Sequence, residues 1–358
     1  MSLLRKFLTV FLAIALLFSF SGCKSLGGVL DFAYFNTAVH IETHDKPISA
    51  QTETLIKNTL SNFENEFSTN KETSLIYNFN LAKKDASFNL SDLQAQVLKQ
   101  GKDAFLFTGG LFNPAVYPLV KLWGFAPYSY TPNYTPPTQE QIQSALSLCD
   151  FNNAQIDFEN KVLTKTNEHT KLDLSGLVKG VCADAVAQIL KDAGHTSGYV
   201  NIGGSSLNLL KVSSLGIRHP EKAGESLLTV NTKNYADLSV STSGDYERYY
   251  TDSDGNRYTH LINPFTGKTA NTGVSSATII GINGGLGDAL TTALCLCEYS
   301  AVKTNSPLTI LANKIITEYP DCMIFIVYKK EQTKLILTNK TLNQHFTITD
   351  QSYSVVNI

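Results

Sequence analysis

The sequence predicts a single mixed α+β domain, and three observations lead to that prediction. Stretches with apolar residues at helical spacing alternate along the chain with strand-like stretches. No internal repeat or low-complexity linker separates them, and 358 residues can bury one large core, although two domains would also be possible. Hydrophobic residues make up 43% of the chain and charged residues 17%, which is ordinary for a globular protein and argues against disorder.

The first residues are predicted to form a secretory leader rather than part of the fold. Arg5 and Lys6 precede an apolar run over residues 7–20, which is followed by Ser21-Gly22-Cys23. A cysteine after two small residues resembles a bacterial lipobox, in which Cys23 is lipidated and becomes the mature N-terminus. We therefore expect a signal peptide over 1–22, a short tether over 23–30 and the domain over 31–358. The protein would be exported and anchored to the outer face of the bacterial cytoplasmic membrane.

The leader has two alternative interpretations. It could be a plain signal peptide that is cleaved nearby, or an uncleaved anchor helix. The apolar run is short for a helix that crosses a bilayer, which argues against the anchor.

Charge and cysteine content argue against two further classes of protein. The formal net charge is −2 and falls to about −4 when the leader is removed, and no basic run occurs, so we expect no nucleic-acid surface. Five cysteines remain after Cys23, and an odd number does not make a closed disulfide framework. Cys182, Cys295 and Cys297 lie in apolar, helix-like runs that are typical of small buried hydrophobic residues. We expect no metal–thiolate site.

Helices and strands are predicted in the first half of the chain from spacing and breaker residues. Leu55, Leu60, Phe63 and Phe67 give one helix its apolar face, and Ser91 is suited to cap the next. The expected elements are a strand over 31–42, helices over 51–68 and 91–105, a turn leading into a core helix over 108–125, a loop over 127–139, a helix over 139–148 and a hairpin over 155–163.

The second half is predicted in the same way. A long helix should bury Leu177, Val181, Ala185 and either Ile189 or Leu190, and should end at Gly194. The expected elements are that helix over 173–190, a strand over 198–202 that leaves through a glycine pair, a strand over 277–281, a helix from 288, and a hairpin over 321–328 and 334–337.

The start of the last predicted helix carries the clearest chemical signal. Asp288 and Thr292 are four residues apart, so a helix places them on one face. Two hard oxygen ligands side by side suit Mg²⁺, which takes few protein ligands and leaves other positions to water and substrate phosphate. The alternative interpretation is that Asp288 is an ordinary N-cap after Gly-Gly-Leu-Gly.

Five separated segments together resemble the FAD:protein FMN transferase family, the ApbE-like flavin transferases. Each segment alone is a weak signal, but their order is that of the family, and with the first strand they span about 35–296. The segments are Gly-Leu-Phe-Asn-Pro with Leu-Trp-Gly, residues 173–184, Asn-Ile-Gly-Gly from Asn201, the region from Ser-Thr-Ser-Gly-Asp-Tyr to His-Leu-Ile-Asn-Pro-x-Thr-Gly, and Gly-Asp-Ala-Leu-Thr-Thr-Ala. The resemblance implies an ApbE-like, T-fold-like α+β domain that is exported, often as a lipoprotein.

The family's reaction splits FAD at its pyrophosphate. The FMN half is esterified through phosphate to a Thr or Ser of an acceptor protein, and AMP leaves. Such a step needs cations and donors fixed around the pyrophosphate. The resemblance implies that Asp288 and Thr292 are side-chain ligands of Mg²⁺, with the backbone carbonyl of Gly176 as a third ligand. The acceptor would be a flavoprotein such as a membrane redox-pump subunit or an exported electron carrier.

The resemblance also implies contacts to FAD and a catalytic histidine. His260 would be a general base or would orient the acceptor hydroxyl. The residues implied to contact the flavin nucleotide or to shape its pocket are Phe35, Leu111, Phe112, Asn113, Asp173, Lys179, Ser243, Gly244, Asp245 and Ile262.

Structural interpretations remain open for several of these residues. Asp173 could cap its helix, Lys179 could be solvated, and His260 could be structural; Ser-Thr-Ser-Gly is also common in turns. Two positions depart from the family pattern. Asn113 stands where Asp is most usual, which keeps one acceptor but loses the charge, and Ser205-Ser206 stands where an acid is more usual.

Two other functions fit part of the sequence. The first is an exported FAD-binding protein or a Mg²⁺-dependent FAD pyrophosphatase that passes the FMN half to water. The second is a solute-binding lipoprotein that holds a ligand between lobes, which would leave the pairing of Asp288 with Thr292 without a purpose.

Overall fold

The computed structural model describes residues 27–126, 134–300 and 305–358. The predicted leader, Cys23 and part of the loop predicted over 127–139 lie outside these residues. The helices are α2 (Ala50–Phe67), α3 (Leu75–Leu81), α4 (Asp92–Phe107), α5 (Tyr117–Leu122), α6 (Gln139–Leu146), α7 (Ser175–Asp192), α8 (Gly284–Cys295) and α9 (Pro307–Glu318), with a 3₁₀ turn η1 (Phe151–Asn153).

The strands run from near the beginning of the described chain to its end. They are β1 (Val29–Tyr34), β2 (Thr37–Thr43), β3 (Ser87–Asn89), β4 (Ala154–Asp157), β5 (Val162–Lys165), β6 (Gly198–Ile202), β7 (Ser206–Lys211), β8 (Ser214–Arg218), β9 (Ser226–Asn231), β10 (Leu238–Gly244), β11 (Tyr249–Thr251), β12 (Arg257–Thr259), β13 (Val274–Ile280), β14 (Met323–Lys330), β15 (Thr333–Thr338), β16 (Phe346–Ile348) and β17 (Ser354–Asn357).

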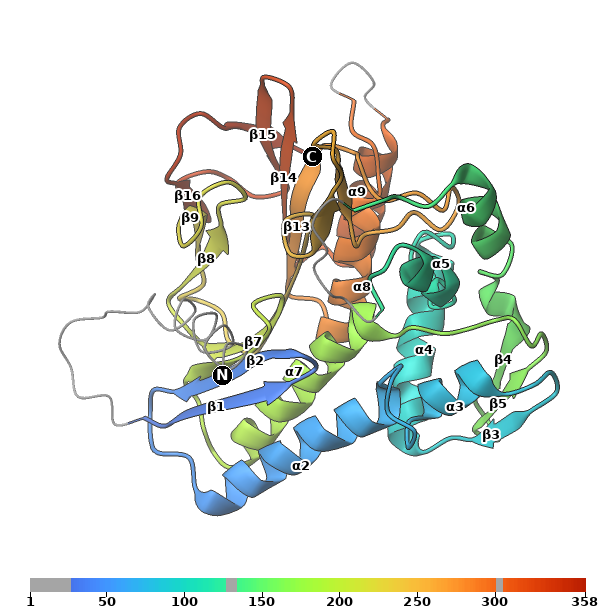
Figure 1. The fold of residues 1–358 in the computed structure, drawn as a ribbon. Helices are drawn as coiled ribbons and strands as arrows, with labels where there is room; N and C mark the ends of the chain where they lie inside the picture. The colour runs from blue at the N-terminus through green and yellow to red at the C-terminus, as the bar shows by residue number, and fades with distance from the viewer. Residues whose placement is uncertain (1–26, 127–133, 301–304) are drawn as a thin grey trace, which may run out of the picture.

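A nine-stranded sheet organises the described residues. Its order is β1-β2-β6-β7-β10-β13-β14-β15-β17, and only the β15–β17 pair is parallel. Helices α2, α4, α7 and α8 pack against one face, while the small sheet β16-β9-β8 packs against the other (Figure 1). This architecture confirms the predicted α+β class.

The alternation of side chains in the central strands explains how the sheet is covered on both faces. In β14, Ile324 and Ile326 belong to the helix-side core, whereas Phe325 belongs to the core shared with the small sheet. Ala277 of β13 faces the helices and Ile280 faces the small sheet. Successive strand residues point to opposite faces, so β13 is buried along its whole length and β14 is buried until its last two residues.

Local sequence signals account for several helix ends. Ser91 and Gln94 form a reciprocal capping box at the start of α4, as the sequence predicts for Ser91. Gly194 follows the end of α7 with φ +77, which confirms its predicted role in ending that helix.

Three expectations about individual elements are wrong. The predicted strand over 31–42 is a hairpin, and Phe35 lies in its turn with φ +55. Leu55 is 50% exposed, because the buried face of α2 runs through Thr52, Ile56 and Leu60 instead. Ala185 of α7 is only partly buried, because the helix turns Val186 toward the core, whereas Leu177, Val181 and, of the last pair, Leu190 are buried as predicted.

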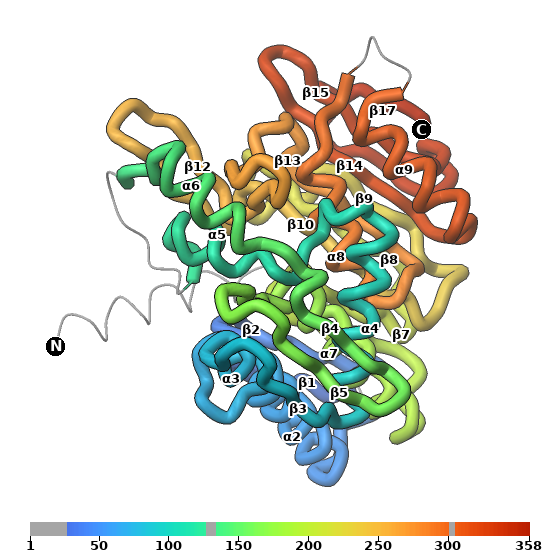
Figure 2. Tube along the Cα trace, turned by 90° about the vertical axis from the view of Figure 1, so that its right-hand side faces the viewer, coloured from blue at the N-terminus to red at the C-terminus, as the bar shows by residue number. Residues whose placement is uncertain are grey.

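A third apolar cluster lies around Trp123, beside the main core. The indole Nε1 donates to Gly267 O at 2.8 Å, and the ring stacks on Tyr258 of β12. The cluster joins α5 and α6 to the hairpin β11–β12, and Figure 2 shows α6 and β12 side by side.

Within the described ranges, no helix combines the length and apolar content needed to cross a bilayer.

Candidate functional site

Asp288 lies in the second turn of α8, not at its start. The helix begins at Gly284, and the cap is Asn283, whose Oδ1 accepts from Leu286 N at 3.0 Å. Both the predicted helix start and the alternative N-cap role for Asp288 are therefore wrong. The side chain of Asp288 is only 7% exposed, so its carboxylate is placed inside the protein rather than at a solvated helix end.

Two rows of residues, each spaced by four, bring α7 and α8 together. Gly180 N donates to Asp288 Oδ2 at 2.8 Å, and Gly284 N donates to Asp184 Oδ2 at 2.6 Å. A Cβ at Gly180 would lie 2.0 Å from Gly284 O, so the helices touch through backbone at this point. We call this contact the α7–α8 crossing.

The crossing also sets what lies one turn further along each helix. On α7, Gly176 precedes Gly180 by one turn, and on α8, Thr292 follows Asp288 by one turn. Because residues nearer the start of α7 pair with residues nearer the end of α8, this register carries Thr292 toward Gly176. The three predicted metal ligands are thus on the facing sides of two helices.

Strong hydrogen bonds and burial shape the electrostatics of Asp288. Its Oδ2 also accepts from Ser206 Oγ at 2.7 Å. Burial raises the pKa of Asp288 to about 6, while the nearby charge of Lys179 and the hydrogen bonds oppose that rise. A buried carboxylate of this kind is stabilised by a cation.

The donors around Asp288 fit Mg²⁺ by their chemistry. Thr292 Oγ1 lies 3.2 Å from Ser243 Oγ, and Ser243 Oγ lies 3.0 Å from Thr291 Oγ1, so hydroxyls line this part of α8. In a regular α-helix, Gly180 N would donate to Gly176 O. Here Gly180 N donates to Asp288 Oδ2, so the Gly176 carbonyl does not have this donor to itself. One carboxylate, a hydroxyl and a carbonyl are oxygen ligands that Mg²⁺ accepts. In the part of the chain that the structure describes, no group of three or more His, Cys, Asp or Glu could hold a metal ion.

Lys179 lies between Asp288 and the glycine turn after β6. Its Nζ donates to Ser205 Oγ at 2.6 Å, and burial lowers its pKa while Asp288 opposes that effect. Lys179 is therefore not the freely solvated helix lysine of the alternative interpretation. Ser205 and Ser206, which depart from the family pattern, bond directly to Lys179 and Asp288. Sequence reasoning did not assign these two serines to the site.

His260 directly follows β12, and a backbone carbonyl defines the tautomer of its ring. Nδ1 lies 3.2 Å from Arg248 O, and a carbonyl can only accept, so Nδ1 carries the proton and Nε2 has a lone pair. Burial of the ring lowers the pKa of His260 to about 4, with further lowering from Arg248 and Lys179. The neutral ring can accept a proton at Nε2 near pH 7.

Gly244 and Asp245 follow Ser243 at the end of β10, and Ile262 belongs to the apolar cluster around Trp123. Burial raises the pKa of Asp245 to about 6, opposed by Arg257, whose nitrogen is 4.0 Å from the carboxylate. A Cβ at Gly244 would lie 2.8 Å from the Tyr246 ring, so this end of β10 is closely packed. Ile262 is buried and forms an isolated bridge with Thr269.

Phe112 covers the first turn of α7. A Cβ at Gly176 would lie 3.1 Å from its ring, so Phe112 is placed beside the predicted carbonyl ligand, and the preceding Leu111 is half-buried. Phe35 is placed differently. Its N–H donates to Glu64 Oε1 of α2 at 2.7 Å, so the structure ties it by hydrogen bond to α2 and not to the Asp288 cluster.

Asn113 and Asp173 hold the backbone between α4 and α7. Asn113 Nδ2 donates to Cys149 O at 2.9 Å, and its Oδ1 accepts from Ala115 N at 2.8 Å. An Asp could not make the first of these bonds, so the amide has a structural use here. Asp173 Oδ1 accepts from Ser175 N at 2.8 Å. The cap residue of α7 is Leu174, so the alternative that Asp173 is the N-cap is wrong.

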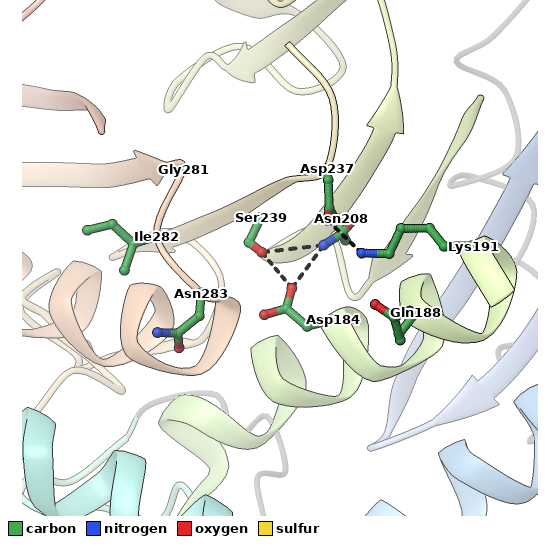
Figure 3. Close-up of a pocket in the computed structure, with 9 residues that line it drawn as sticks. All are labelled: Asp184, Gln188, Lys191, Asn208, Asp237, Ser239, Gly281, Ile282 and Asn283. Atoms are coloured by element: carbon green, nitrogen blue, oxygen red, sulfur yellow. Dashed lines mark hydrogen bonds and ion pairs between the residues drawn. The ribbon is translucent and has the colours of Figure 1, made fainter. Parts of the chain in front are cut away.

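A pocket of about 300 Å³ lies at the Asp184 side of the α7–α8 crossing (Figure 3). None of the residues predicted for the site lines it. It is lined by Asp184, Gln188, Lys191, Asn208, Asp237, Ser239, Gly281, Ile282 and Asn283. The pocket is therefore separate from the predicted chemistry, although Asp184 belongs to both the pocket wall and the crossing.

Comparison with known proteins identifies the group to which these features belong. The model of the ApbE family matches residues 35–305. An FAD:protein FMN transferase of Vibrio cholerae is 29% identical over 292 residues, which cover 79% of this chain and 85% of the relative. Another of Treponema pallidum is 33% identical over 211 residues, which cover 54% of this chain and 56% of the relative.

Solved structures agree with these sequence matches. The flavin transferase ApbE from Vibrio cholerae has a TM-score of 0.72 at 25% identity, covering 85% of this chain and 94% of that structure. The ApbE protein from Thermotoga maritima has a TM-score of 0.71 at 26% identity, covering 84% and 94%.

Proposed function

The chain belongs to the ApbE family, and from this premise we propose that it is an FAD:protein FMN transferase. It splits FAD at the pyrophosphate, attaches the FMN half through a phosphoester to a Thr or Ser of an acceptor protein, and releases AMP. One observation carries the proposal: a buried carboxylate, a lysine and several hydroxyls converge at the α7–α8 crossing, where a pyrophosphate needs charge and positioning.

Mg²⁺ is part of this proposal. Asp288, Thr292 and the carbonyl of Gly176 would hold it, and it would neutralise charge on the pyrophosphate oxygens. Support comes from the fit of the oxygen ligands and from the burial of Asp288, which favours a nearby cation.

The chain's own residues supply the remaining parts of the reaction. The acceptor hydroxyl gives its proton to Nε2 of His260 while its oxygen bonds to the phosphorus of the FMN half. The bond from that phosphorus to the bridging oxygen breaks, and AMP leaves with the electron pair. Lys179 adds positive charge beside Asp288, where the substrate phosphates would lie.

The remaining contacts to FAD are proposed from position. Phe112 beside Gly176 and the adjacent Leu111 are suited to pack on a ring of the dinucleotide, and Ser243 contacts Thr292 directly. Asn113 is proposed to act through the turn that it holds, because both ends of its amide are already bonded.

The transferase reaction is tested with FAD, MgCl₂ and an acceptor protein of one of the relatives named above. AMP release together with flavin fluorescence that stays on the denatured acceptor is the expected result. Free FMN in place of attached flavin would instead identify a pyrophosphatase. No AMP with or without acceptor would contradict both activities and leave an FAD-binding or solute-binding protein.

Export as a lipoprotein is a separate proposal. Its support is the charged, apolar and small-residue order of residues 1–23. Cys23→Ser should move the protein from the membrane fraction to the soluble exported fraction. Retention of the variant in membranes would contradict lipid anchoring at this cysteine. The acceptor would then be reached outside the cytoplasm, as a redox-pump subunit or an exported electron carrier.

A further inference from the structure

Asp184 joins three elements at the α7–α8 crossing. Its Oδ2 accepts from Gly284 N at 2.6 Å, at the first residue of α8. Its Oδ1 accepts from Ser239 Oγ at 2.6 Å and from Asn208 Nδ2 at 3.0 Å (Figure 3). One carboxylate of α7 thereby connects the start of α8 to strands β10 and β7.

The position of Asp184 relates it to the predicted metal ligands. It lies one turn beyond Gly180 on α7, and its partner Gly284 lies one turn before Asp288 on α8. At Gly180 and Gly284 the backbones are already in contact, so the helices cannot move closer. The bond from Asp184 to Gly284 opposes sliding and separation, which contact alone does not prevent. A shift of α8 would displace Asp288 and Thr292 from the Gly176 carbonyl together.

Helix capping does not account for this arrangement by itself. Asn283 already caps α8 through Leu286 N. A carboxylate near a helix N-terminus is stabilising in any case, but two hydrogen bonds from separate strands also fix the direction of the Asp184 side chain. Groups that orient metal ligands from behind are commonly held in this way.

We propose that Asp184 is a positioning residue that sets the register of α8 on α7, and through it the spacing of the Mg²⁺ ligands. This inference rests on the proposed function. Asp184 touches neither the substrate nor the metal in this role. It is partly exposed along the pocket wall, so replacing it leaves no enclosed cavity.

The experiment compares Asp184→Asn with the wild-type chain in MgCl₂ titrations. One arm measures AMP release from FAD, and the other measures the thermal shift that MgCl₂ produces at saturating FAD. The expected result is a rise of about 10-fold or more in the half-saturating magnesium concentration in both arms. FAD binding without magnesium should be unchanged, and saturating magnesium should restore most of the rate.

Asp237→Asn is the matched control. Asp237 lines the same pocket and pairs with Lys191 at 2.6 Å, but Lys191 belongs to the far end of α7, away from Gly284. This variant should leave the half-saturating magnesium concentration at the wild-type value. An equal rise in both variants would overturn the proposal, because it would reflect the charge of the pocket.

Ser239→Ala provides a milder second variant, since it removes one donor to Asp184 and keeps the carboxylate. It should raise the half-saturating concentration by about 2- to 5-fold. It decides the question if Asp184→Asn does not fold. The proposal would be overturned if every folded variant had the half-saturating magnesium concentration of the wild type, even if the variants melted at a lower temperature. If the wild type releases no AMP, the proposed function fails, and the thermal arm still decides the role of Asp184.

Discussion

Two buried charges in this protein have opposite surroundings. Asp288, at the α7–α8 crossing, accepts from Ser206 and Gly180 and lies near Lys179. Lys165 of β5 is fully buried, and its Nζ donates to Phe79 O at 2.8 Å and lies 5.0 Å from the Phe79 ring centroid. No carboxylate of the described residues lies within 4.0 Å of Lys165 Nζ in an ion pair.

This difference distinguishes a charge that belongs to a ligand-binding site from a charge that has only a structural role. Around Asp288, polar groups from two helices and two strands converge, and an added cation or phosphate would find further partners there. Around Lys165, the described residues supply one carbonyl and one ring as direct contacts of the ammonium group, and the side chain has no exposed surface. Burial of a charge alone therefore does not indicate function; convergence of polar groups that can hold a ligand does.

The largest expected effect tests the Asp288 side of this comparison. Asp288→Ala should lower FAD cleavage by about 10³-fold at ordinary magnesium, because it removes the only carboxylate of the donor set. AMP release measured by chromatography checks this. Lys165→Met is the control and should keep wild-type activity. Unchanged AMP production in Asp288→Ala would contradict the assignment of Asp288 to the functional site.

Gly180→Ala tests the close contact on which the site depends. The added Cβ would meet Gly284 O at 2.0 Å, so the helices must separate, and the free energy of unfolding should fall by about 3 kcal/mol. Chemical denaturation measures the change. Gly101→Ala is the matched helical control, because its Cβ would find neighbours only at 3.4 Å or more. Equal effects of the two substitutions would show that the crossing tolerates separation.

His260→Gln should slow FMN transfer by about 10²-fold while FAD affinity is kept. The pKa of His260 is lowered to about 4, so the ring stays neutral above that pH and the wild-type rate should not fall through pH 6.5. Stopped assays from pH 4 to 8, with FAD binding followed by flavin fluorescence, check both points. A larger loss of FAD affinity than of rate would assign His260 to binding instead.

The smallest expected effect concerns Lys165. Burial lowers its pKa to about 8 from 10.5, so between these values the unfolded chain binds more protons and the wild-type stability rises with pH. Lys165→Met should be more stable by about 1 kcal/mol at pH 7, and the gain should shrink toward pH 10.5. Denaturation at pH 7, 9 and 10 measures this.

Exposed Lys84 provides the control for that substitution. Lys84→Met should change stability by less than about 0.5 kcal/mol at each pH. A loss of stability in Lys165→Met, with no change in Lys84→Met, would show that the buried charge of Lys165 stabilises the fold. That result would weaken the contrast with Asp288.

Much of the fold could be predicted because its signals are local. Apolar spacing located most helices, Ser91 and Gly194 marked helix ends, and the hairpin after α6 was found from its turn. The failures were also local. The turn at Phe35 and Asn36 interrupts an alternating stretch without a glycine or proline, so a single asparagine is the only sequence signal that separates β1 from β2.

The candidate site was predicted only in part. The spacing of Asp288 and Thr292 placed both on one helix face, and the structure agrees. The start of α8 was missed because Gly-Gly-Leu-Gly has low helix propensity. Close packing of Gly284 and Gly285 against α7 and of Gly287 against Ser241 of β10 compensates for it. Ser205 and Ser206 looked like departures from a pattern, but they bond to Lys179 and Asp288.

The sequence by itself determined the α+β class, the polar pair on α8 and the glycines that permit a close helix contact. Only the tertiary structure decided that Asp184, Ser206 and Gly180 meet α8, since these residues lie about 80 to 110 positions from their partners. The physical reason is that hydrophobic periodicity specifies which face of an element is buried, whereas the partner of a buried polar group depends on how separate elements pack.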